Sequence, residues 1–158
     1  MTSGPGRVSE IRLTEWTTCG GCAAKWGAGL LRSLVADLAS EGGPDRLLVG
    51  LAPFDDAAVL RLTDELALVS TTDFFPPLVD DPADFGAIAA ANACSDVFAM
   101  GGDVHLAVNI AAFPERLPVV AIERILGAAA DTVRAAGGVV GGGHTIRSDE
   151  PIFGLAVQ

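Results

Sequence analysis

The amino-acid sequence predicts an α+β fold, in which a mixed or antiparallel sheet packs against helices. Three segments with helical periodicity and several apolar, strand-like runs follow one another without the strict alternation of a doubly wound fold. The chain has 158 residues, of which 50% are hydrophobic. It therefore suits one compact domain with a substantial core, and it is too apolar for a disordered chain.

The N-terminal quarter is predicted to contain an arm, a short strand, a loop and a helix. Residues 1–10 are small and polar, so we expect a flexible arm there and a single domain over residues 11–158. Weak alternation over 11–16 favours a short strand, and the glycines and cysteines of 17–24 favour a loop. A helix is expected over 24–40, because its apolar residues form one stripe of Leu30, Leu31, Leu34, Val35 and Leu38.

The middle of the chain combines a hairpin with a capped helix. Apolar runs with β-branched residues at 57–62 and 66–72 flank a short polar turn, which predicts a β-hairpin. Asp81 is a suitable helix cap and Pro82 suits a first helical turn, so a helix is expected over 82–100.

The C-terminal part adds three strands, a helix and a glycine-rich turn. We expect a strand over 104–113, a helix over 118–136 and a short strand at 139–140. The glycines of 141–144 then predict a turn, and 152–157 is a last apolar strand.

Charge and composition exclude several classes of function. The formal net charge of −10 repels nucleic-acid backbones, and a polyanionic ligand would need a divalent cation beside these carboxylates. No apolar run reaches the ~18 residues of a membrane-spanning helix, and the N-terminus lacks the apolar segment of a signal peptide. Three cysteines do not suggest a disulfide scaffold. We therefore expect a cytoplasmic protein with no nucleic-acid or membrane partner.

The segment from Cys19 to Lys25 is the first candidate for chemistry. An ammonium group and a helix N-terminus both stabilise a thiolate, so Cys22, three residues before the only lysine of the chain, is a candidate reactive thiol. A redox disulfide between Cys19 and Cys22, a zinc site and an ordinary surface loop are the alternatives that spacing alone leaves open. Zinc would need two further ligands, for which the chain offers Cys94, His105 and His144.

Four aspartates form the second candidate. Asp55, Asp56, Asp73 and Asp96 lie next to apolar strands or helices, and neighbouring carboxylates at the edge of a core repel each other unless a cation lies between them. Mg²⁺ takes one or two carboxylates together with phosphate oxygens. Asp96 falls near the C-terminal end of its predicted helix, where a carboxylate is disfavoured by about 0.3–1 kcal/mol, and Asn92 shares its face. Ligand binding and a tolerated surface aspartate both explain that position.

The run from Gly141 to Thr145 is the third candidate. Glycines let backbone N–H groups approach phosphates closely, although the run matches neither a Walker A loop nor a dinucleotide-binding fingerprint. A plain tight turn is the alternative interpretation.

Taken in order, these segments resemble selenophosphate synthetase (selenide, water dikinase), a family within the aminoimidazole ribonucleotide synthetase-like superfamily. The resemblance covers the chain from about Ile11 to its end. The blocks that carry it are Leu13-Thr14-Glu15-Trp16, Cys22-x-x-Lys25, Asp55-Asp56-Ala57-Ala58-Val59, Thr71-Thr72-Asp73-Phe74-Phe75, Asp80-Asp81-Pro82-x-Asp84-Phe85-Gly86, Ala89-Ala90-Ala91-Asn92-Ala93, Ser95-Asp96-Val97-Phe98-Ala99-Met100-Gly101-Gly102, Gly142-Gly143-His144 and Pro151-Ile152-Phe153-Gly154-Leu155-Ala156-Val157.

The resemblance implies an N-terminal ATP-binding domain and a reaction in which ATP, selenide and water give selenophosphate, AMP and phosphate. It implies that Cys22 and Lys25 are catalytic, that Lys25 also contacts ATP, and that Asp56 and Asp96 bind Mg²⁺. It further implies a set of ATP-binding residues, which comprises Pro53, Phe54, Asp55, Asp73, Asp96, Gly143, His144 and Thr145.

The resemblance also implies partners. Relatives build a barrel from two such sheets, so a homodimer is expected. Full-length members carry a second domain of similar size, so the chain corresponds to an N-terminal fragment, or a separate chain supplies the other domain. The alternatives are a superfamily kinase or ligase that acts on another substrate, and a non-catalytic module that binds ATP and Mg²⁺.

Overall fold

The protein is described by a computed structural model, which covers residues 11–21, 27–40, 43–51 and 55–158. A short 3-10 helix, η2 (Leu13–Trp16), comes first in the chain. The remaining elements follow in the order α1 (Ala28–Ser40), β1 (Leu47–Val49), β2 (Ala58–Arg61), β3 (Ala67–Phe75), α2 (Pro82–Ala99), β4 (Leu106–Phe113), α3 (Val119–Ala135), β5 (Val139–Arg147) and β6 (Ile152–Val157).

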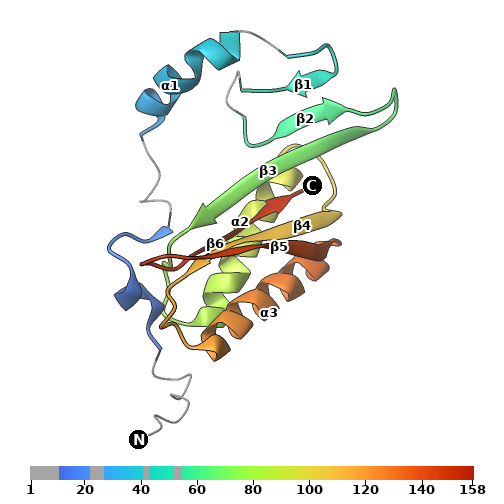
Figure 1. Ribbon diagram of the computed structural model, residues 1–158. Coiled ribbons are helices and arrows are strands. Elements are labelled where there is room, and N and C mark those ends of the chain that lie inside the picture. Colours follow the sequence, from blue (N-terminus) through green and yellow to red (C-terminus); the bar gives the residue numbers. More distant parts are fainter. Residues whose placement is uncertain (1–10, 22–26, 41–42, 52–54) are drawn as a thin grey trace, which may run out of the picture.

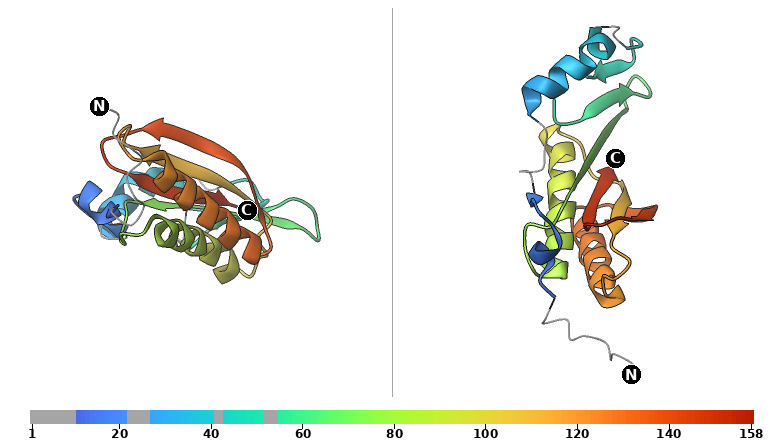
Figure 2. Two further views of the ribbon diagram at one scale, coloured as in Figure 1. Left: turned by 90° about the horizontal axis from the view of Figure 1, so that it is seen from below. Right: turned by 60° about the vertical axis from the view of Figure 1, so that its left-hand side comes forward.

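The strands form one six-stranded mixed sheet in the order β1-β2-β3-β6-β4-β5. Neighbouring strands are antiparallel except for β4 and β5, which are parallel. Figure 1 and the left view of Figure 2 show α2 and α3 side by side on one face of this sheet. The expected α+β architecture, with a mixed sheet packed against helices, is confirmed.

The core lies between the helical pair and the sheet. Phe85 of α2 and Phe153 of β6 are fully buried, and their ring centroids lie 6.3 Å apart in an edge-to-face arrangement. The two helices approach closely at Gly86, where an added Cβ would lie 2.1 Å from the carbonyl oxygen of Ile125. A glycine is required at this crossing because the neighbouring atom is backbone and cannot move aside.

The expected cap of the second long helix is confirmed. Asp81 accepts hydrogen bonds from the backbone N–H groups of Ala83 (2.8 Å) and Asp84 (3.1 Å), and Arg124 of α3 donates to the same carboxylate at 2.9 Å. Burial opposes these effects, but together they hold the pKa of Asp81 below its usual value. The cap therefore also ties the start of α2 to α3.

The part of the chain made of α1, β1 and β2 projects from the body formed by the other elements, and the long strand β3 links the two (Figure 1; Figure 2, right). The expected stripe of α1 therefore lies largely exposed to solvent. Its leucines Leu30, Leu31, Leu34 and Leu38 have exposed fractions of 54%, 48%, 60% and 58%.

Two sequence-based expectations differ from the structure, and one strand was missed. Residues 11–16 were expected to form a strand but contain η2, because Leu13 donates its N–H to the carbonyl of Asp80 and Glu15 donates to that of Arg12. β1 was not predicted, since three residues carry too little periodicity. The expected turn at 141–144 lies inside β5, whose pairing with β4 shifts register beside Gly141.

Candidate functional site

Two hydrogen bonds link the centre of β3 to the last two turns of α2. Thr71 donates from Oγ1 to Oδ2 of Asp96 at 2.7 Å, and Asn92 donates from Nδ2 to Oδ2 of Asp73. Asp73 and Asp96, both expected ligand-binding residues, are thus brought to the same seam between sheet and helix. Their partly buried side chains are oriented by a hydroxyl and an amide donor.

The geometry of the two elements explains why both bonds form together. Residues 71 and 73 lie on one face of the strand and are about 6.6 Å apart along it. Asn92 and Asp96 lie on one face of the helix and are about 6 Å apart along its axis. The two spacings match, and the strand and the helix run in opposite directions. Thr71 therefore lies opposite Asp96, and Asp73 lies opposite Asn92. We name Thr71, Asp73, Asn92 and Asp96 the seam cluster.

Asp55 and Asp56 lie beside this cluster, just before β2. The hydroxyl of Thr71 also lies 3.4 Å from the carbonyl oxygen of Asp56, which connects the Asp55–Asp56 turn to Asp96 through one side chain. Both aspartates line a hollow of about 640 Å³ with Thr71 and, from α1, Leu31. Both are exposed, so they are accessible to a ligand in this hollow.

A second hollow, of about 390 Å³, is lined in part by Asp73. Gly21, Phe74, Pro76 and Ile152 are among the residues that line it with Asp73. Gly21 is held there by a hydrogen bond of 3.0 Å from its N–H to the carbonyl oxygen of Pro76. The described segment that leads into the Cys22–Lys25 motif therefore ends in a hollow that Asp73, one of the candidate ATP-binding residues, also lines.

Four expected site residues lie outside the described residues: Cys22, Lys25, Pro53 and Phe54. Their placement relative to the seam cluster stays a prediction. The expected flexible arm at 1–10 lies outside the described residues as well.

Gly143, His144 and Thr145 lie on β5, at the far edge of the described sheet. Cross-strand pairing gives one row across the sheet, from Asp73 through Leu155 and Asn109 to Gly143. Three strand spacings of about 4.8 Å put roughly 14 Å between its ends. The side chain of His144 lies on the face opposite Asp73, because neighbours along a strand point to opposite sides. The structure therefore does not bring these three residues into direct contact with the carboxylates.

Asn109 was not singled out in the sequence. Its Oδ1 is buried and has no hydrogen-bond partner among the residues that the structure describes. A lone amide in the apolar run Leu106–Phe113 is the sequence signal that points to it. It lies in the row between Asp73 and Gly143, on the face that the helices cover.

The zinc alternative includes Cys22, which lies outside the described residues, so only its other proposed ligands can be placed. Cys94 lies in α2 with 2% of its surface exposed, and burial raises the pKa of its thiol. Within residues 11–21, 27–40, 43–51 and 55–158, no three side chains of the usual ligand types gather closely enough to hold a metal ion.

None of the helices in these same ranges has the length and apolar character that crossing a membrane requires.

Known proteins resemble this chain in sequence and in fold. The family model for the N-terminal domain of AIR synthase related protein matches residues 54–158. A selenide, water dikinase of Myxococcus xanthus (strain DK1622) is 50% identical over 146 residues, which cover 92% of this chain and 41% of that protein. The selenide, water dikinase of Clostridioides difficile (strain 630) is 47% identical over 152 residues, which cover 96% and 44%.

Among solved structures, the protein tt0281 of Thermus thermophilus matches with a TM-score of 0.68 and 25% identity, over 80% of this chain and 42% of that one. The expected resemblance to selenophosphate synthetases and the expected superfamily fold are thus both confirmed. The chain spans about two fifths of the length of the curated relatives given above.

Proposed function

Because the chain belongs to the AIR synthase related proteins through their N-terminal domain, we propose that it is the ATP-binding part of a selenide, water dikinase. The proposed reaction converts ATP, selenide and water into selenophosphate, AMP and phosphate. Since the chain spans 41% of the Myxococcus protein, the complete site is proposed to need the second domain, from the same polypeptide or from a separate chain.

The hollow shared by Gly21 and Asp73 is the observation that carries this proposal. Consecutive Cα atoms lie about 3.8 Å apart across a trans peptide, so Cys22 follows Gly21 within one such step. This supports a thiol near Asp73, one of the residues that are proposed to bind ATP. Cys22 is proposed to act as a thiolate beside the reacting phosphate, and Lys25 would stabilise both this thiolate and the transferring phosphate.

Asp56 and Asp96 are proposed to hold Mg²⁺. Carboxylate oxygens are the hard donors that Mg²⁺ prefers, and the Thr71 hydroxyl lies within 3.4 Å of the Asp56 carbonyl and 2.7 Å of Asp96. The bound ion would neutralise charge on the transferring phosphate. A site built from two protein carboxylates and ATP oxygens does not require a third side-chain ligand.

The other proposed ATP contacts divide between the seam cluster and the β5 edge of the sheet. Asp73 belongs to the seam cluster and Asp55 lies beside it, with Pro53 and Phe54 just before Asp55 in the chain. Gly143, His144 and Thr145 lie on β5, across the row that passes through Asn109. This separation supports a site to which more than one chain or domain contributes, since one nucleotide would otherwise have to span much of the sheet.

A homodimer is proposed as the assembly. No described helix covers the sheet face opposite α2 and α3, and large apolar side chains lie there, including Phe74 of β3 and Ile146 of β5, with exposed fractions of 51% and 54%. Contiguous exposed apolar surface is typical of an interaction site. A cytoplasmic location is part of the same proposal.

The test is ATP turnover by the chain together with its second domain, in Mg²⁺ and with or without selenide. We expect AMP formation that requires selenide, is abolished in Cys22→Ser and persists in Arg134→Ala, a substitution in an exposed ion pair on α3. Selenide-independent turnover that survives Cys22→Ser would instead identify a kinase or ligase of another specificity. Mg²⁺-dependent ATP binding without AMP formation would identify a non-catalytic module.

A further inference from the structure

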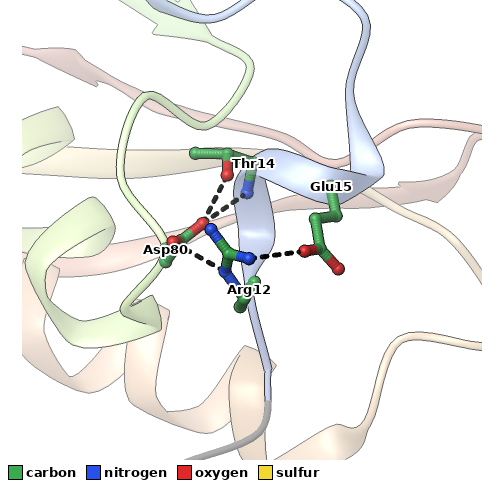
Figure 3. A network of polar contacts seen from close by, with 4 residues as sticks. All are labelled: Arg12, Thr14, Glu15 and Asp80. Atoms are coloured by element: carbon green, nitrogen blue, oxygen red, sulfur yellow. Dashed lines mark hydrogen bonds and ion pairs between the residues drawn. The ribbon is translucent and has the colours of Figure 1, made fainter.

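The segment from Arg12 to Gly21, here called the leader segment, is attached to a loop that follows β3. Figure 3 shows Asp80 accepting from the backbone N–H of Thr14 at 3.3 Å, from the Thr14 hydroxyl, and from Nε of Arg12 at 3.1 Å. Arg12 also binds Glu15 at 2.9 Å. Leu13 between them is fully buried. Asp80 therefore uses both carboxylate oxygens to hold one end of this segment.

A second carboxylate holds the same segment further along, from the loop between β5 and β6. Glu150 accepts from the Thr17 hydroxyl at 2.7 Å, from the Thr18 hydroxyl at 3.1 Å and from the Thr18 N–H at 3.4 Å. Asp80 and Glu150 are 70 residues apart in the sequence, yet both accept hydrogen bonds from residues within 12–18. The described partners of the Glu150 carboxylate are all threonines, so no described ion pair to a lysine or arginine accounts for its position.

Packing adds two further attachments. The guanidinium of Arg116 lies 5.0 Å from the ring centroid of Trp16, a distance typical of a cation–π contact. At the other end, Gly20 approaches the loop after β3 so closely that an added Cβ would lie 2.7 Å from the carbonyl oxygen of Pro77. The leader segment is thus fixed at successive points up to Gly21, which lines the hollow of Asp73.

These attachments assign a role to two sequence blocks that the proposed reaction leaves unexplained, Leu13–Trp16 and the acidic pair that begins at Asp80. We propose that Asp80 and Glu150 are positioning residues. They hold the leader segment, including Gly21, the residue before Cys22, against the hollow that Asp73 lines. The attachment of the leader segment rests on the geometry of the described residues. Its effect on Cys22 rests on the proposed function.

The first arm of the test measures the attachment without any ligand, by amide hydrogen exchange. In Glu150→Ala we expect the N–H groups of Thr18 and Gly21 to exchange about tenfold faster or more, while those of β4 and β6 are unchanged. The double variant Thr17→Val, Thr18→Val removes the hydroxyl donors and should reproduce the effect without changing Glu150. Glu115→Ala is the matched control, because it removes an exposed glutamate whose ion pair with Arg147 is long, at 3.6 Å.

The second arm measures the consequence, as protection of Cys22 from iodoacetamide by ATP and Mg²⁺. We expect strong protection in the wild type and the Glu115→Ala control, and loss of most of it in Asp80→Ala and Glu150→Ala while the affinity for ATP changes less than about twofold. Partial rescue by Glu150→Gln, which keeps one carbonyl acceptor, would separate positioning from loss of folding.

The two arms distinguish the possible failures. Unchanged exchange at Thr18 and Gly21 in both Glu150→Ala and the threonine double variant overturns the attachment. Faster exchange with undiminished protection of Cys22 overturns the positioning role. A wild-type protein that binds no ATP in Mg²⁺ overturns the proposed function, and the positioning role with it, while the exchange arm still decides the attachment.

Discussion

Thr71 donates a hydrogen bond of 2.7 Å to Asp96, and this bond joins the middle of β3 to the last turn of α2. A carboxylate at a helix C-terminus is disfavoured by about 0.3–1 kcal/mol, because it faces the negative end of the helix dipole. A hydroxyl donor of the correct geometry offsets that cost and fixes the direction of the carboxylate. Asp96 is thereby held at the seam with the direction of its carboxylate fixed, as its proposed role in binding Mg²⁺ would require.

Thr71→Val should show what this bond contributes. The substitution keeps the shape of the side chain but removes the donor, so we expect the free energy of unfolding to fall by about 1–2 kcal/mol. The affinity for ATP in Mg²⁺ should fall as well, because Asp96 loses its orientation. Chemical denaturation and calorimetric titration measure the two effects.

Thr72→Val is the matched control for the stability part of this prediction only, because Thr72 also lines both hollows. Thr72 is the next residue of β3, lies on the opposite face and is exposed, so its replacement should leave the stability within about 0.5 kcal/mol of the wild type. Equal losses in the two variants would contradict a specific role for the Thr71 hydroxyl.

Asn92→Asp should replace the hydrogen bond between Asn92 and Asp73 by repulsion between two carboxylates. The amide that donates to Asp73 becomes a second carboxylate, and two such groups in contact repel unless a cation lies between them. We expect a loss of about 1–3 kcal/mol at neutral pH in EDTA, with part of it recovered in millimolar Mg²⁺. Thermal unfolding under the two conditions measures this, and Asn92→Ala should show no recovery with Mg²⁺.

Most of the fold was predictable because its signals are local. The hairpin, the cap at Asp81 and the apolar strand Ile152–Val157 each depend on a few neighbouring residues, and the structure confirms them. The strand expected at 11–16 was wrong because its conformation depends on Asp80, far away in the sequence. The turn expected at 141–144 was wrong for a similar reason, since pairing with β4 extends the glycines into a strand.

The sequence indicated which residues could form the candidate site but not which of them are hydrogen-bonded to each other. The sequence indicated Asp73, Asp96 and Asn92, yet nothing in it pairs Asn92 with Asp73 or Thr71 with Asp96, because each pairing depends on how α2 lies on the sheet. The roles of Asp80 and Glu150 depend on the same kind of long-range contact. Local pattern identifies residue types that suit a ligand, whereas tertiary packing decides which of them meet.

Acid should release the leader segment. The Thr14 hydroxyl holds the pKa of Asp80 below its usual value, and burial opposes this shift. The hydroxyl of Thr17, followed by that of Thr18, does the same for Glu150. A carboxyl whose pKa is lower in the folded state stabilises it fully above the unfolded values of about 3.9 for Asp and 4.3 for Glu, and this contribution is lost as the pH falls through the lower folded values.

Amide NMR shifts of Thr14 and Thr18 measured from pH 6 to 2.5 test this expectation. Both signals should move together with protonation of the carboxyl to which each is bound. In Glu150→Gln the acid transition should disappear at Thr18 and persist at Thr14, since Asp80 is unchanged. A transition that persists at both positions would show that another group causes it.

Gly143→Ala should disturb the edge of the sheet. An added Cβ would lie 2.5 Å from the carbonyl oxygen and 2.7 Å from the Cβ of Asn109, so β5 must move away from β4. We expect a loss of about 1–3 kcal/mol in unfolding free energy, together with weaker ATP binding if β5 contributes to the site. Gly127→Ala in α3 is the control: an added Cβ meets no atom within 4 Å, so the variant should be neutral or about 0.5–1 kcal/mol more stable. Equal stability of the two variants would mean that β5 accommodates a side chain by a small shift, and the close approach to Asn109 would then not constrain position 143.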